Sequence, residues 1–254
     1  MSFGSLPIAF ENIAEKCEKH DVALIKSPKF DGTLCPKCEL EAINQEHQKE
    51  VDTIVQELNR RERLYFIKEL SMYDDALANA SFENFETPTE IEKEKLRWAK
   101  VAAFSWLNGE KHNIVLRGKA GTGKSHLAFA MVKALSDKSN KKALFVNVPT
   151  LMDRAADSNF AKKNFYIDQL SKVDYLVLDD LGKEMKGNLG KGMIYSILNA
   201  RSNTLITTNL SDRELMDHYD RDPAILTRIK KGIAKDSINE MSFDDLTNKR
   251  TIYC

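Results

Sequence analysis

The chain has 254 residues, which is enough for one α/β domain of about 150 residues and a smaller appendage. Its 38 basic and 38 acidic residues give zero formal charge, so no global basic field indicates nucleic acid, and any such contact must use a local patch. The sequence has no run that approaches the ~18 apolar residues of a membrane span, and it does not begin with a secretory signal pattern. We therefore expect a cytoplasmic protein with no membrane partner.

Three of the four cysteines lie in the first 38 residues and form short pairs. Cys17 and His20 are three residues apart, as are Cys35 and Cys38. Each such pair can hold one side of a tetrahedral ion from a tight turn, so the spacing predicts a closed, structural zinc site. The alternative is a set of reduced cysteines with an incidental histidine. We place a zinc-binding module at residues 1–40.

Residues 40–70 contain neither proline nor glycine, and their apolar residues recur at mostly helical spacing among charges. This pattern predicts one long helix or a helical hairpin, which is either a solvated connector or a helix that docks on a partner protein. Residues 71–89 are interrupted by asparagines and a proline, so we expect a hinge there. The linker is assigned to 41–78 and the second domain to 79–254, with a helix over 90–107.

Residues 118–125, Gly-Lys-Ala-Gly-Thr-Gly-Lys-Ser, satisfy every position of the pattern G-x-x-x-x-G-K-[ST]. A predicted strand (114–116) precedes them and a predicted helix (126–132) follows, which is the context that this pattern requires. We therefore predict a nucleoside triphosphate site in which Lys124 and backbone N–H groups contact the phosphates and the Ser125 hydroxyl ligates Mg²⁺. The residues expected to bind the nucleotide are Gly118, Ala120, Gly121, Thr122, Gly123, Lys124, Ser125 and His126.

Two further apolar runs, residues 143–148 and 174–180, predict buried strands of a parallel sheet that is covered on both faces. The second run ends in Asp179 and Asp180, a Walker B pattern of four apolar residues followed by carboxylates. We expect Asp179 to hold Mg²⁺ through water, and Asp180 to orient the attacking water.

Residues 202–209 predict a fourth strand, which ends on the amide of Asn209 at the carboxyl edge of the sheet, where ligands bind. A neutral amide there can hydrogen-bond the water or the γ-phosphate without competing for metal. Residues 225–232 predict a helix end, and residues 233–243 predict a last strand.

These motifs, with Thr207-Thr208-Asn209-Leu210 and Arg228-Ile229, resemble in their order the AAA+ ATPases that load the bacterial replicative helicase, the DnaC/DnaI type. The resemblance covers residues 80–243; the N-terminal module resembles the DnaI branch, and the compact size is similar to versions carried by phages. It implies an α/β AAA+ P-loop ATPase with a central parallel sheet, and ATP, Mg²⁺ and Zn²⁺ as cofactors. It also implies three partners: the hexameric replicative helicase, single-stranded DNA, and further copies of the chain when ATP binds.

The same resemblance implies that Asn209 is the first sensor and Arg228 the arginine finger of a neighbouring subunit's site. Arg221 is the competing arginine, but its two flanking aspartates favour a local salt-bridged turn. Most AAA+ proteins have glutamate at the position of Asp180, and the shorter side chain predicts slow hydrolysis. Only 26 residues follow Arg228, too few for a helical lid, so a second sensor on a lid is not expected.

Residues 152–172 alternate cations with aromatic residues, a composition that suits the phosphates and bases of single-stranded DNA. The family resemblance implies such a contact, whereas the alternative is an amphipathic helix that covers the sheet. The helicase loader is the first functional hypothesis. A transposition-helper ATPase (IstB-like), a metabolite kinase and a non-enzymatic zinc adaptor for nucleic acid are the others. The zinc module followed by a helix favours the loader.

Overall fold

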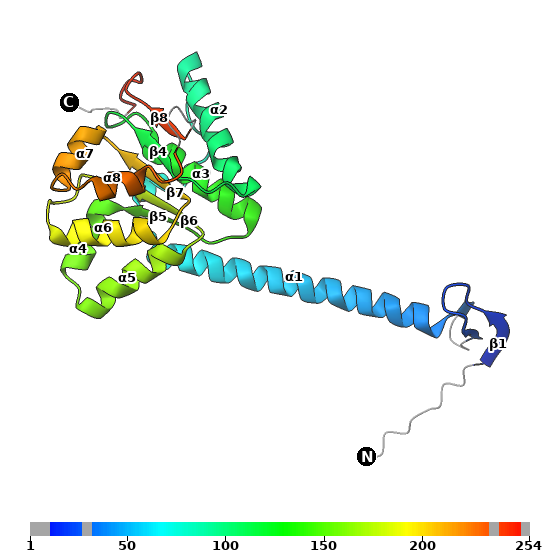
Figure 1. Ribbon diagram of the computed structural model, residues 1–254. Coiled ribbons are helices and arrows are strands. Elements are labelled where there is room, and N and C mark those ends of the chain that lie inside the picture. Colours follow the sequence, from blue (N-terminus) through cyan, green and yellow to red (C-terminus); the bar gives the residue numbers. More distant parts are fainter. Residues whose placement is uncertain (1–10, 27–31, 234–238, 250–254) are drawn as a thin grey trace. The chain divides into compact units, whose positions relative to one another are not determined.

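The computed structural model describes residues 11–26, 32–233 and 239–249 (Figure 1). The chain divides into two compact units, residues 1–61 and 62–254. The division falls within helix α1 (Pro36–Leu70), after Arg61. Among the described residues, none of the helices has the length and the apolar character that a membrane crossing requires.

The first unit contains a small antiparallel sheet. Its strands β1 (Glu11–Lys16), β2 (Ala23–Lys26) and β3 (Thr33–Leu34) pair in the order β1-β2-β3. Helix α1 begins at Pro36, before the expected residue 40, and a proline fits there because the first turn of a helix needs no donor from its N–H. The helix is a single one, not a hairpin.

The second unit is built on a parallel sheet of five strands, as the sequence predicted, and their order is β5-β6-β7-β4-β8. The strands are β4 (Ile114–Arg117), β5 (Ala143–Asn147), β6 (Tyr175–Asp179), β7 (Thr204–Thr208) and β8 (Glu240–Ser242). The expected strand at 233–243 was too long: Ile233 and Phe243 are not in β8, and residues 234–238 lie outside the described part. Strand β5 stops before Val148 because the Asn147 side chain caps the next helix.

Two apolar clusters lie on opposite faces of this sheet, because successive side chains of each strand point to opposite sides. Helices α2 (Glu90–Ser105) and α3 (Lys124–Ser139) cover one face. The other face packs on α4 (Val148–Ala156), α5 (Phe160–Lys172), α6 (Asn188–Ala200), α7 (Asp212–His218) and α8 (Pro223–Ile229). The α/β class with a two-sided core is therefore confirmed.

The segment expected to be a hinge, residues 71–89, packs into the second unit. Met72 forms a parallel bridge beside β5, where its N–H donates to Phe145 O at 2.7 Å and its carbonyl accepts from Asn147 N at 2.8 Å. The short 3-10 helix η1 (Asp75–Leu77) follows, and Phe82 and Phe85 are buried in the core that contains α2 and α3. These contacts hold the segment against the sheet, so the hinge expectation was wrong.

Helix α2 begins at Glu90, as predicted, and ends at Ser105, two residues before the predicted end. Thr89 and Glu92 form a reciprocal capping box at its start. The 3-10 helix η2 (Trp106–Asn108) extends it to Gly109, whose φ of 87° gives the left-handed stop that glycine permits.

Candidate nucleotide site and metal cluster

The phosphate-binding pattern lies between the end of β4 and the start of α3. Gly123 precedes α3 with a φ of 91°, a conformation that glycine adopts without strain, and the first N–H groups of a helix have no partner within the helix itself. Lys124 Nζ donates to the carbonyl oxygens of Gly118 and Lys119, each at 2.7 Å. Burial lowers the pKa of Lys124 to about 8. The negative charge of a phosphate group placed here would favour the charged form of Lys124.

Ser125 and Asp179 meet beneath the loop. Ser125 Oγ donates to Asp179 Oδ1 at 2.7 Å, and Thr207 Oγ1 donates to the same oxygen at 2.7 Å. Burial raises the pKa of Asp179. A hydroxyl and a carboxylate at this distance form the oxygen pair that Mg²⁺ prefers, so these two residues fit the predicted metal role. Sequence analysis missed Thr207 as a partner of Asp179, although a threonine inside a buried strand is a weak signal.

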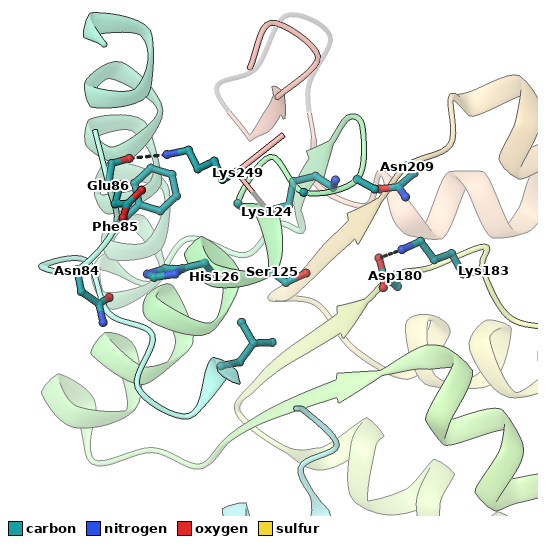
Figure 2. Close-up of a pocket in the computed structure, with 14 residues that line it drawn as sticks. Asn84, Phe85, Glu86, Lys124, Ser125, His126, Asp180, Lys183, Asn209 and Lys249 are labelled. Atoms are coloured by element: carbon teal, nitrogen blue, oxygen red, sulfur yellow. Dashed lines mark hydrogen bonds and ion pairs between the residues drawn. The ribbon is translucent and has the colours of Figure 1, made fainter. Parts of the chain in front are cut away.

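Asp180 follows β6 in the left-handed region with a φ of 59°, which is uncommon for a residue with a side chain. Its backbone N–H donates to Thr207 Oγ1 at 2.9 Å, and this bond helps to hold the turn. Its carboxylate contacts Lys183 Nζ at 2.8 Å (Figure 2). Lys183 was not among the predicted site residues, and a single lysine after a Walker B strand gives little signal.

A cleft of about 380 Å³, within the size range of ligand pockets, joins these groups to Asn209 (Figure 2). Asn209 lines the cleft together with Lys124, Ser125 and Asp180. The Oδ1 atom of Asn209 is buried and has no hydrogen-bond partner among the described residues. Because an unpaired buried acceptor is costly, this orphaned atom indicates that a ligand or water completes the site.

The opposite end of the cleft is formed by parts of the chain that the sequence did not associate with the loop. Phe85 lies so close to Gly123 that a Cβ atom on this glycine would come within 2.8 Å of the ring. The Phe85 and His126 rings meet edge to face at 5.4 Å. Glu86 and Lys249 complete this end (Figure 2). No local pattern could have found Lys249, which contacts Glu86 across 163 positions of sequence.

Arg228 is not brought to this cleft. It lies on α8, where its Nε donates to Asn199 Oδ1 at 3.0 Å and its guanidinium lies 4.6 Å from the centre of the Tyr195 ring. The competing Arg221 is exposed and pairs with Asp217 at 3.1 Å. The salt-bridged turn expected for it is therefore present, but with a different acid, because Lys191 lies beside the two flanking aspartates.

The four predicted zinc ligands converge in the first unit. Their ligand atoms all lie within 4.8 Å of one another. Tetrahedral zinc bound at standard lengths would place two sulfurs about 3.8 Å apart and a sulfur and a nitrogen about 3.6 Å apart. Cys17 Sγ and Cys38 Sγ are 3.7 Å apart, and His20 Nδ1 lies 3.6 Å from Cys35 Sγ and 3.3 Å from Cys38 Sγ. This donor set fits zinc in both type and spacing.

Glu41 supports the cluster from outside it. His20 uses Nδ1 toward the thiols, and its Nε2 lies 3.0 Å from Glu41 Oε1. Lys19 Nζ contacts the other carboxylate oxygen at 2.5 Å. A carboxylate behind a histidine fixes the ring orientation and increases its basicity as a ligand. Sequence analysis missed Glu41, and its position one helical turn after Cys38 is the signal that could have found it.

Residues 152–172 form parts of α4 and all of α5, so the amphipathic helix that covers the sheet is present, whereas the contact with single-stranded DNA stays a prediction. Tyr166 and Leu170 are buried against the sheet, as expected for an amphipathic helix. Phe160 and Phe165 of the same helix are 79% and 49% exposed. Lys162 is exposed beside them. The helix thus covers the core and also presents aromatic rings with a cation on its outer side.

A sequence profile described as IstB-like ATP binding protein matches residues 41–245, which is most of the chain. The chain belongs to this family. The description of this family as ATP-binding agrees with the phosphate-loop geometry of this IstB-like protein. The match begins within α1 and extends past β8, so it includes the whole cleft except Lys249.

Curated relatives of this IstB-like protein carry the name replicative helicase loader DnaC. One from Buchnera aphidicola subsp. Acyrthosiphon pisum is 29% identical over 197 residues, which cover 75% of this chain and 76% of the relative. One from Escherichia coli strain K12 is 28% identical over 142 residues, which cover 55% and 57%. Among solved structures, DnaI superposes with a TM-score of 0.57 at 24% identity, over 68% of this chain and 95% of that chain. The expected resemblance to the DnaC/DnaI type and the AAA+ fold are confirmed, whereas a phage origin stays a prediction.

Proposed function

We propose that this chain is an ATPase that binds the hexameric replicative helicase and helps to place it on single-stranded DNA. The observation that carries the ATPase part is the convergence of Lys124, Ser125, Asp180 and Asn209 from separate segments on one cleft, with Asp179 hydrogen-bonded to Ser125 beside it. The loader part is supported by relatives that are named replicative helicase loader.

Each side chain of the cleft has a role that its position supports. Lys124 binds the β- and γ-phosphates, and Ser125 with Asp179 holds Mg²⁺, which neutralises charge on the phosphates when it is bound. Asp180 orients the attacking water, and the unpaired Oδ1 of Asn209 accepts a hydrogen bond from that water. The ion pair between Asp180 and Lys183 must break for Asp180 to reach the water, and the Asp180 side chain is short. We therefore expect slow turnover.

Arg228 acts on a neighbouring copy of the chain, so that complete sites form only in an oligomer. Two facts support this proposal. Arg228 does not line the cleft of its own chain, and its guanidinium is held on α8 by Asn199 and the Tyr195 ring, partly open to solvent. A guanidinium supplied from outside would stabilise charge on the γ-phosphate.

The first module of the N-terminal part binds zinc, and the helix that follows it docks on a partner protein. Zinc is held by Cys17, His20, Cys35 and Cys38, and the sulfur and nitrogen distances support a tetrahedral ion. We assign the zinc module to 1–40, the docking linker to 41–78 and the ATPase domain to 79–254, although the last residues of the linker, from Ser71 on, pack on the ATPase sheet. Exposed apolar side chains along α1 favour docking over a solvated connector. They are Leu40, Ile43, Val51, Ile54, Val55 and Leu58.

Single-stranded DNA is bound in part by the outer side of α5. Exposed aromatic rings there can stack on bases, and neighbouring lysines can contact phosphates. Phe160 and Phe165 are the exposed rings that support this proposal.

The test is a pull-down of the purified full-length chain against the replicative helicase of its host, with and without ATP. We expect retention of the helicase by the wild type and loss of retention when Ile54 and Leu58 are both changed to Ser. The control is Gln48→Ala and Asp52→Ala, which changes an exposed polar pair of the same helix. No retention of the helicase, with capture of a transposase on DNA instead, would favour the IstB-like transposition helper.

A further inference from the structure

The segment that follows β8, residues 243–249, lies directly on the phosphate loop, and we call it the C-terminal clasp. Phe243 is fully buried, and its N–H donates to Arg117 O at 2.7 Å, at the point where β4 enters the loop. Asp244 Oδ1 accepts from Lys119 N at 3.1 Å. At the other end of the clasp, Lys249 N donates to Gly121 O at 2.8 Å. Three backbone positions of the loop region are therefore tied to the clasp.

The glycines of the loop leave room for this contact. A Cβ atom on Gly118 would lie 2.9 Å from the carbonyl carbon of Phe243, and one on Gly121 would lie 1.8 Å from Asn248 Oδ1. Both distances are shorter than a real Cβ contact. Because they have no side chain, the two glycines leave space for the clasp on one side of the loop. This is in addition to any role that they have toward phosphate on the other side of the loop.

Lys249 extends from the clasp to the end of the cleft that Phe85 and Glu86 form (Figure 2). Its Nζ lies 2.5 Å from Glu86 O and 2.9 Å from Glu92 Oε1, and 4.4 Å from the centre of the Phe85 ring. The Glu92 carboxylate is almost fully buried, with 4% of its side chain exposed, and it also caps α2. The Lys249 ammonium group therefore contacts the Glu86 carbonyl, the Glu92 carboxylate and the Phe85 ring at the same time.

This end of the cleft is unlike the phosphate end. It offers the Phe85 and His126 rings, the Asn84 side chain and the Glu86 carbonyl, whereas the phosphate end offers Lys124, Ser125 and Asp180. Aromatic rings beside a backbone acceptor suit a nucleobase, whereas a lysine beside an acid and a hydroxyl suits phosphates with Mg²⁺.

We propose that the C-terminal clasp forms part of the nucleotide site. In this proposal Lys249 is a positioning residue, which holds the Phe85 ring and the Glu86 carbonyl in place for the base. This inference rests on the proposed binding of ATP. Lys249 also brings a cation of the same chain to the cleft, from the segment that follows α8, where the sequence predicted no second sensor on a lid.

The test compares two ligands, MgATP and inorganic tripolyphosphate, on the full-length protein by calorimetry. Tripolyphosphate carries the phosphates but no base. Lys249→Met should weaken MgATP about 3- to 10-fold, as for one or two lost hydrogen bonds, and leave tripolyphosphate unchanged. Lys249→Arg should restore MgATP affinity. The control Lys93→Met removes an exposed lysine that pairs with Glu90 on α2, and it should change neither ligand.

Equal MgATP affinity in Lys249→Met and wild type would overturn the inference, as would an equal loss of both ligands. If the wild type binds tripolyphosphate as tightly as MgATP, the base adds no affinity. The inference then fails, while the phosphate site stands. If the wild type binds neither ligand, the proposed function itself fails. Should Lys249→Met melt well below the wild type, Phe85→Leu gives the second test, since it removes the ring and keeps apolar volume. The same selective loss of MgATP is expected, and its absence would overturn the inference.

Discussion

Ser125 Oγ and Asp179 Oδ1 lie 2.7 Å apart, although 54 residues separate them in sequence. Ser125 lies in the first turn of α3 and Asp179 ends β6, so the contact exists because β6 and the phosphate loop share the carboxyl edge of one parallel sheet. Thr207 from β7 completes the contact at the same carboxylate oxygen. Three elements therefore fix the position at which we place Mg²⁺.

Lys124→Ala should abolish ATP turnover, with a loss of about 10²-fold or more, because the lysine supplies a charge that the phosphates need. The fold should remain, although the carbonyls of Gly118 and Lys119 lose their donor. Fluorescent ATP binding and a melting curve should be measured on the same sample. ATP binding at wild-type affinity in this variant would show that the nucleotide site is elsewhere.

Zinc should bind at one ion per chain through the cluster of Cys17, His20, Cys35 and Cys38. The double change Cys35→Ser and Cys38→Ser should remove the metal, because a tetrahedral site does not persist on two ligands. Elemental analysis of the purified protein checks this. Full retention of zinc by the double variant would contradict the assignment.

Glu41→Gln gives a graded version of the zinc experiment. The variant keeps all four ligands but weakens the support of His20 Nε2, so zinc affinity should fall about 10- to 100-fold without loss of binding. Competition with a zinc chelator measures the change. Glu39→Gln, an exposed acid in the first turn of the same helix, is the matched control and should leave the affinity unchanged.

Arg228→Ala should lose about 10³- to 10⁵-fold in turnover if the arginine acts on a neighbouring subunit. Mixing it with Lys124→Ala protein should then restore activity, because some sites of the mixed assembly contain both residues. ATPase rate against mixing ratio is the measurement. No gain despite demonstrated co-assembly would mean that the site is complete in one chain and that Arg228 only stabilises the end of α8.

Arg201 offers a test of the fold itself. Its side chain is buried, and its Nη1 donates to the carbonyl oxygens of Leu170 and Val173 at 2.8 and 2.7 Å. Burial lowers its pKa to about 10. Arg201→Leu should lower the free energy of unfolding by about 2–4 kcal/mol, because several carbonyls at the end of α5 lose their donor. Urea unfolding measures it, with the exposed Arg97→Leu as a control that should change little.

The sequence by itself determined the parts that depend on near neighbours in the chain. The phosphate loop, the paired zinc ligands and the acids that end β6 are short patterns whose chemistry requires a fixed local spacing. The alternation of apolar runs with helical segments was also sufficient for the parallel sheet, because strands buried on both faces have a distinct composition.

Only the tertiary structure decided which distant residues complete these sites. Thr207 reaches Asp179 because β7 pairs with β6, and Phe85 reaches Gly123 because residues 71–89 pack on the sheet instead of forming a hinge. Lys249 reaches Glu86 because β8 joins the sheet beside β4 and delivers the clasp to the phosphate loop. Such contacts depend on strand order and chain path. These are set by the burial of the whole core and leave no pattern at any fixed spacing in the sequence.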